Sequence, residues 1–113
     1  MKVYIAGPIT NHPDYKDKFY DAEMALVSEG HTILNPSELP RGLTNADYMR
    51  ICFAMIDVAD IVAFLPGWEE SQGASLEHAY CQYIGKQTLY LVSYRPYQDR
   101  VTLPEPDENG FSF

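Results

Sequence analysis

The chain of 113 residues has little positive charge, with 8 Lys and Arg against 16 Asp and Glu and a formal net charge of −8. Nucleic acids and anionic membrane surfaces are bound through clustered Lys and Arg, which this sequence does not supply. We therefore expect neither a nucleic-acid polymer nor a membrane as a partner. A small anionic ligand stays open, because backbone N–H groups can hold one without a basic surface.

The sequence is also poor in cysteine, since Cys52 and Cys81 are the only two, whereas a small secreted scaffold would carry four, six or eight. Their apolar neighbours predict buried free thiols. The histidines and cysteines share no metal-ligand spacing, so neither a metal nor a cofactor is expected. No run approaches the roughly 18–20 apolar residues of a membrane span, and no secretory signal precedes the first strand. These absences together predict a cytoplasmic protein.

Short apolar runs alternate with helical patterns, which is typical of βαβ units. The segment 61–65 is apolar throughout, as expected when helices cover both faces of a sheet. Asp14 and Thr44 are the expected N-caps of the first two helices, and Gly85 ends the third. Strands are expected over 3–6, 32–34, 61–65 and 88–92, and helices over 15–29, 45–59 and 74–84.

This order of elements predicts an α/β fold, a small flavodoxin-like (Rossmann-like) parallel sheet with strand order 2-1-3-4 and helices on both faces. Ligands of such sheets bind beyond the carboxyl ends of the strands where the strand order reverses. The loops 7–12 and 66–73 follow those strands and are the predicted ligand-binding loops. We expect residues 1–93 to form the domain and residues 94–113, rich in Pro and acids, a C-terminal arm or tail at an oligomer interface.

The first loop contains Gly7, Pro8, Ile9 and Thr10. It lacks the three spaced glycines of a dinucleotide-binding fingerprint and the lysine of a phosphate-binding loop. Turn chemistry alone explains a Gly-Pro pair. A ligand-binding role and a purely structural role therefore both remain open for this loop.

The second loop leads into a helix, so Ser71 and the free N–H groups after it are candidates for holding an anion. Trp68 either stacks on a planar base or covers the edge of the sheet, and the sequence favours neither. Glu77 falls near the first turn of that helix. A lone glutamate there is explained by a favourable charge in solvent as well as by a function.

Three motifs together change this balance: Tyr4-Ile5-Ala6-Gly7-Pro8-Ile9, Ala59-Asp60-Ile61-Val62 and Ser71-Gln72-Gly73-Ala74-Ser75-Leu76-Glu77. With them the chain resembles the nucleoside 2-deoxyribosyltransferase-like superfamily over about residues 1–92. Within it the chain most resembles a small phage and bacterial branch marked by a Leu-Pro-Gly-Trp-Glu run, which residues 65–69 reproduce.

The resemblance implies cleavage or transfer of an N-glycosidic bond in a nucleoside or nucleoside 5′-monophosphate. It implies that Glu77 is the nucleophile at the anomeric carbon, that Tyr4 positions it, and that Ser71 and Gly73 contact a phosphate or the sugar. Trp68 is expected as a base-stacking wall. The relatives are dimers or larger, so a homodimer or higher homo-oligomer is expected.

The sequence departs from the family at the active site. Cys52 occupies the position of a carboxylate that orients the sugar or assists the leaving base, and a thiol is a poor replacement for either role. Pro8 and Thr10 stand where the nucleotide-hydrolysing relatives carry Ser and Arg. The alternative is therefore a catalytically weak module that binds or sequesters a nucleotide in the same pocket.

Overall fold

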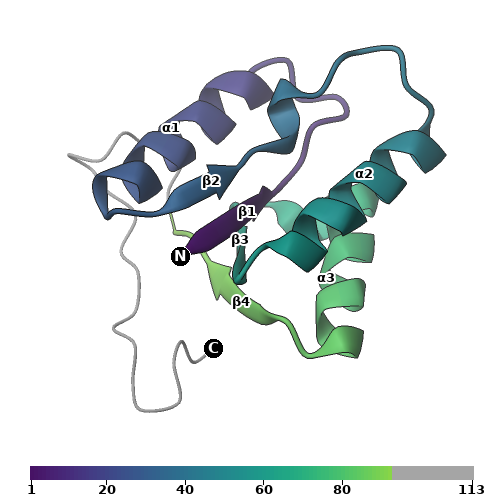
Figure 1. Ribbon diagram of the computed structural model, residues 1–113. Helices are drawn as coiled ribbons and strands as arrows, with labels where there is room; N and C mark the ends of the chain where they lie inside the picture. Colours follow the sequence, from purple (N-terminus) through teal and green to yellow (C-terminus); the bar gives the residue numbers. More distant parts are fainter. Residues whose placement is uncertain (93–113) are drawn as a thin grey trace.

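The computed structural model describes residues 1–92, and its strands form one parallel sheet (Figure 1). The order across the sheet is β2-β1-β3-β4, and every neighbouring pair is parallel. The predicted fold class and strand order are confirmed. The predicted arm at 94–113 lies outside the described residues. The strands are β1 (Lys2–Ala6), β2 (Thr32–Leu34), β3 (Ile61–Phe64) and β4 (Gln87–Tyr90).

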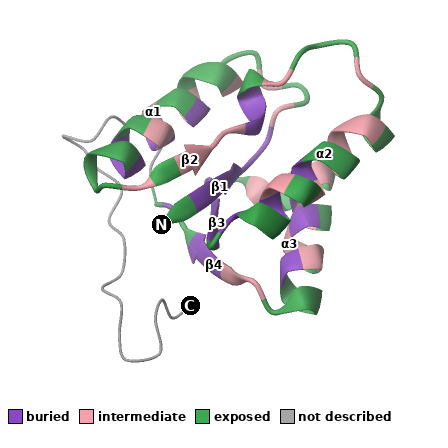
Figure 2. Cartoon of the chain, viewed as in Figure 1, coloured by how far each residue is buried: buried purple, intermediate pink, exposed green. Residues whose placement is uncertain are grey.

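Helices cover both faces of this sheet because successive strand side chains point to opposite sides. Val3 and Ile5 of β1 join the core under α1 (Tyr15–Ser28), whereas Tyr4 and Ala6 face α2 (Asn45–Val58) and α3 (Gln72–Ile84). The two inner strands, β1 and β3, are accordingly buried almost throughout, whereas the edge strand β2 has no buried residue (Figure 2). None of the helices within residues 1–92 is long and apolar enough to cross a membrane.

Two short 3-10 helices, η1 (Pro36–Glu38) and η2 (Trp68–Glu70), interrupt the loops that follow β2 and β3. β3 and β4 are shorter than predicted. The ladder between them ends at the pair Phe64 and Tyr90, so Leu65 and Val92 lie beyond the strands. Both cysteines are buried free thiols, as predicted.

The start of α3 corrects one prediction. Ser71 caps α3, its Oγ accepting the N–H of Ala74 at 3.2 Å, so the helix begins at Gln72 and Glu77 lies in its second turn, not its first. Asp14 occupies the N-cap position of α1, as predicted, but its side chain makes no capping hydrogen bond and its carboxylate pairs with Lys18 at 3.3 Å. By contrast, Thr44 caps α2 as predicted, within a reciprocal capping box.

Gly7 fixes the path of the loop that leaves β1. A Cβ atom at this position would lie 2.8 Å from Cδ1 and 2.9 Å from Cβ of Leu65. Leu65 is itself buried at the end of β3, so neither atom can move away cheaply. The close approach therefore requires glycine, and it holds the loop against β3.

We expect Gly7→Ala to lower the free energy of unfolding by about 1–3 kcal/mol, because it overpacks a filled core. Urea denaturation followed by circular dichroism measures the change. Gly73→Ala is the matched control, since its Cβ would meet only Met49 Cε at an ordinary 3.7 Å. Equal stability of both variants would contradict the packing argument.

Candidate active site

The centre of the site is a buried pair that joins β1 to α3. The Tyr4 hydroxyl donates a hydrogen bond of 2.5 Å to Oε2 of Glu77. Tyr4 has no exposed surface and Glu77 keeps 5% of its own. A carboxyl group is rarely buried without a strong donor, so this contact is what allows Glu77 to sit in the interior.

Cys52 of α2 completes this centre. Its thiol interacts with both Tyr4 and Glu77, and only 6% of the residue is exposed. Burial is the main reason that the pKa of the Cys52 thiol is raised to about 11. The thiol is therefore protonated at neutral pH, which adds no second negative charge beside the carboxyl group.

Glu77 has an unusual acidity for a glutamate. Burial raises the pKa of its carboxyl group to about 7, and the hydrogen bonds from Tyr4 and Cys52 oppose that rise. Burial and the neighbouring carboxyl group in turn raise the pKa of Tyr4 well above its usual range, so Tyr4 is a neutral donor. Glu77 thus exchanges between its acid and its carboxylate near neutrality, as groups in active sites often do.

These three residues lie at one wall of a cavity of about 900 Å³, a size typical of small-molecule sites. The cavity is where the fold predicts it, beyond the carboxyl ends of β1 and β3. The structure brings to it every site residue expected from the sequence except one. Those that line it are Tyr4, Gly7, Pro8, Ile9, Thr10, Ser71, Gly73 and Glu77.

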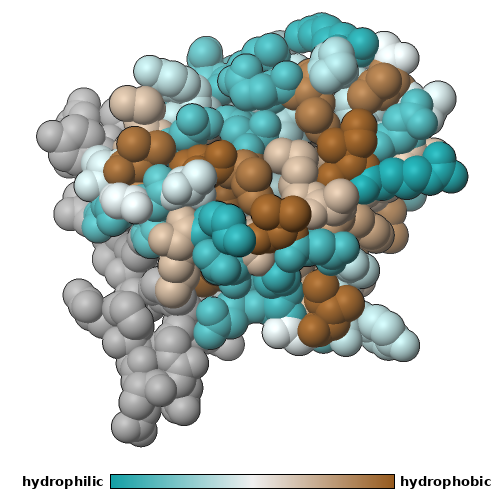
Figure 3. All heavy atoms as spheres, in the orientation of Figure 1, coloured by the Kyte–Doolittle hydropathy of each residue, from teal (hydrophilic) through white to brown (hydrophobic). Residues whose placement is uncertain are grey.

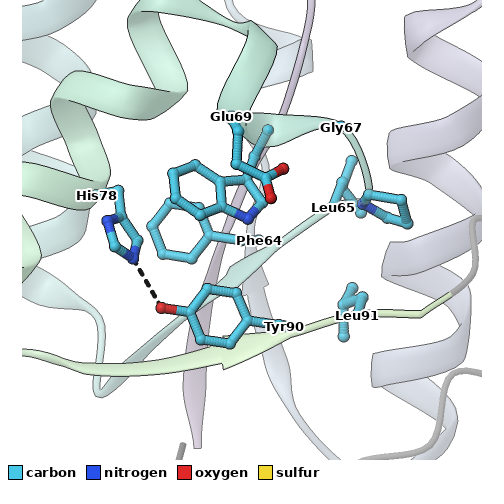
Figure 4. Close-up of a pocket in the computed structure, with 9 residues that line it drawn as sticks. Phe64, Leu65, Gly67, Glu69, His78, Tyr90 and Leu91 are labelled. Carbon is cyan, nitrogen blue, oxygen red and sulfur yellow. Dashed lines mark hydrogen bonds between the residues drawn. The ribbon is translucent and has the colours of Figure 1, made fainter.

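Trp68 is the exception, because it lines a second cavity of about 440 Å³ (Figure 4). Gly67, with φ of 86°, turns the chain immediately before η2 and lines the same second cavity. The Trp68 ring stacks on His78 with centroids 4.2 Å apart and lies 5.1 Å from Phe64. It packs beside Tyr90 of the edge strand β4, so it covers the sheet edge instead of the proposed base site.

One wall of the cavity, which follows β2, is not among the loops predicted from the sequence. Several residues of the segment 36–43 and the beginning of α2 line the large cavity. The carboxyl end of β2 lies beside that of β1 in the parallel sheet, so the predicted strand order already indicated that the loop after β2 would border the site. The residues added by the structure are Pro36, Ser37, Leu39, Arg41, Asn45, Tyr48 and Met49.

A sequence profile of the family DUF4406, described as a domain of unknown function, matches residues 1–90. The chain belongs to this family. DUF4406 is part of the nucleoside 2-deoxyribosyltransferase-like superfamily, which confirms the resemblance stated from the sequence motifs at that level. No curated protein sequence matches the chain significantly.

Three solved structures share the fold across 80% of this chain. A 2-desoxiribosyltransferase from Leishmania mexicana aligns with a TM-score of 0.62 and 24% identity over 63% of its own length. A 2-deoxyribosyltransferase from Bacillus psychrosaccharolyticus aligns with a TM-score of 0.64 and 24% identity over 71%. A conserved protein from Enterococcus faecalis V583 aligns with a TM-score of 0.63 and 17% identity over 62% of its own length. The chain thus spans less than two thirds of the Leishmania protein. At sequence identities of 24% and below, these likenesses show the shared fold alone.

The raised pKa of Glu77 makes the stability of the protein depend on pH. The unfolded chain ionises this group near 4.5 and the folded chain near 7, so this group lowers the free energy of unfolding progressively as pH rises between those values. Glu77→Gln cannot ionise and still accepts the Tyr4 hydrogen bond. We expect this variant to be more stable than the wild type at pH 8 by on the order of 1–3 kcal/mol.

Denaturant titrations at pH 4.5 and pH 8 measure this difference, which should nearly vanish at the lower pH. Glu70→Gln removes an exposed carboxyl group from the same cavity and serves as the control. If Glu77→Gln raised the free energy of unfolding equally at both pH values, ionisation of Glu77 would not be the cause of the increase.

Proposed function

We propose that this protein cleaves or transfers the N-glycosidic bond of a nucleoside or nucleoside 5′-monophosphate, with Glu77 as the nucleophile. One observation carries the proposal: a carboxyl group buried at the wall of a ligand-sized cavity, with a tyrosine hydroxyl on one of its oxygens. The shared fold of two named 2-deoxyribosyltransferases supports the same class of chemistry.

The chemistry follows from the carboxylate form of Glu77. A carboxylate oxygen bonds to the anomeric carbon as the bond to the base breaks, and the base leaves with the electron pair and takes a proton. The product is a glycosyl ester on Glu77. Water then releases the free sugar, or a second base takes the sugar and gives a new nucleoside. Tyr4 holds the carboxyl group in place throughout.

The surface is compatible with the proposed homo-oligomer. Large apolar side chains are exposed on the helices, including Val58 at 54% and Tyr83 at 92%. Figure 3 shows hydrophobic residues gathered across the middle of one face, among hydrophilic ones. Exposed apolar patches of this kind mark contact surfaces, so we propose a dimer or larger assembly.

Cys52 is the specific observation that favours a second candidate. A protonated thiol beside Glu77 neither donates a proton to a leaving base efficiently nor orients a sugar as a carboxylate does. The same cavity would then bind or sequester a nucleotide with little turnover. The two candidates differ in whether free base is released.

Release of free base from a panel of ribo- and deoxyribonucleosides and their 5′-monophosphates, followed by chromatography, tests the first candidate. We expect the wild type to release base and both Glu77→Ala and Glu77→Gln to lose at least about a thousandfold in rate, as removal of a nucleophile does. Glu38→Gln, an exposed carboxyl group outside the cavity, should retain full activity. Tight binding without any base release, retained in Glu77→Gln, would establish the binding module instead.

A second prediction concerns the position of Cys52. We expect Cys52→Asp to raise the rate of base release by about tenfold or more, because a positioned acid contributes on the order of 10²–10⁴ to such reactions. Cys52→Ser has nearly the same volume without an acid and is the matched control. A folded Cys52→Asp protein that is no faster than Cys52→Ser would show that the missing acid does not limit turnover.

A further inference from the structure

Arg41 stands out among the residues of the large cavity. It is the one Lys or Arg side chain among the described residues that line it. Among residues 1–92, Lys18 and Asp14 form an ion pair within 4 Å, and no such pair joins Arg41 to a described carboxylate. No described carboxylate therefore neutralises the Arg41 guanidinium. An exposed cation at a cavity wall without an internal partner is available to a ligand.

The backbone that presents Arg41 is held in place from α2. The Tyr48 hydroxyl donates a hydrogen bond of 2.7 Å to the Pro40 carbonyl and accepts one of 3.4 Å from the Leu43 N–H. These two bonds bracket Arg41, and Gly42, with φ of 95°, completes the turn. Tyr48 follows the capping box that fixes the start of α2, so the turn is anchored to a rigid element.

The rest of the cavity shows which charge this arrangement favours. The amino end of α3, at Ser71 to Gly73, opens onto the same cavity and contributes partial positive charge. Glu70 is the opposing group, an exposed carboxylate at the rim. Glu77 is the other carboxyl group that lines the cavity, and it lies at the buried wall, where we propose that it acts as the nucleophile. A neutral nucleoside would leave the guanidinium of Arg41 unused.

We propose that Arg41 binds an anionic group of the substrate and determines specificity for a charged over a neutral nucleoside, with Tyr48 as its positioning residue. This inference rests on the proposed function. The guanidinium presents its N–H donors in a planar fork that matches phosphate and carboxylate oxygens. The anion is either the 5′-phosphate of a nucleotide or a carboxylate on the base, and both offer the same chemistry to Arg41.

The test compares kcat/KM for uridine and deoxyuridine, for their 5′-monophosphates, and for orotidine, whose base carries a carboxylate. We expect Arg41→Gln to lower kcat/KM about tenfold or more for the anionic substrate, mainly through KM, as loss of a charged hydrogen bond does. Neutral nucleosides should change by less than about twofold. The substrate that suffers the loss identifies the anion. Arg50→Gln, on an exposed residue of α2 outside the cavity, is the control.

Two further variants separate positioning from simple loss of structure. Tyr48→Phe removes both hydrogen bonds to the turn and should weaken the preference for the anionic substrate about threefold, a smaller effect than that of Arg41→Gln. Glu70→Gln removes the opposing charge and should strengthen that preference. A merely structural role would change kcat/KM for charged and neutral substrates alike.

Binding measured by calorimetry on Glu77→Gln, with and without Arg41→Gln, keeps the inference separate from catalysis. If no protein releases base but Arg41→Gln weakens binding of the monophosphate or of orotidine alone, the glycosidase proposal fails and the role of Arg41 stands. Equal losses for charged and neutral ligands, or the same loss in Arg50→Gln, would overturn the inference.

Discussion

The hydrogen bond between Tyr4 and Glu77 is the interaction on which the rest of the site depends. It joins the central strand β1 to α3 and provides the donor that a buried carboxyl group needs. The low-dielectric surroundings that make the carboxyl group costly also raise its pKa to about 7. One contact therefore ties the packing of α3 against the sheet to the proposed chemistry of its second turn.

The parallel sheet is what makes this contact possible. Alternation along β1 sends Val3 and Ile5 into the core under α1, and it sends Tyr4 towards α2 and α3. The same two helices supply Cys52 and Glu77, so the three polar groups meet on one face. The carboxyl ends of the strands lead into loops, and these loops line the cavity together with residues of α2 and α3.

The turn at η2 divides the region beyond β3 into two compartments. Ser71 and Glu77 face the large cavity, whereas Trp68 and His78 stack together in the smaller aromatic one against Phe64 and Tyr90 (Figure 4). Adjacent residues 77 and 78 of α3 thus serve different compartments. The aromatic cluster stabilises the edge of the sheet, and the large cavity is left lined by loops and polar groups.

The sequence by itself determined the class of fold and the strand order, and it selected residues that the structure places around one cavity. Apolar runs alternating with helical patterns leave few topologies for four parallel strands, and the motifs around Tyr4 and Glu77 indicate the proposed site. Tertiary structure alone decided the burial of Glu77, the cavity that Trp68 lines and the position of Arg41 in the wall of the other cavity. Burial, pKa and the direction of a loop depend on contacts between residues distant in the chain, such as Tyr4 with Glu77, and spacing along the sequence does not encode them.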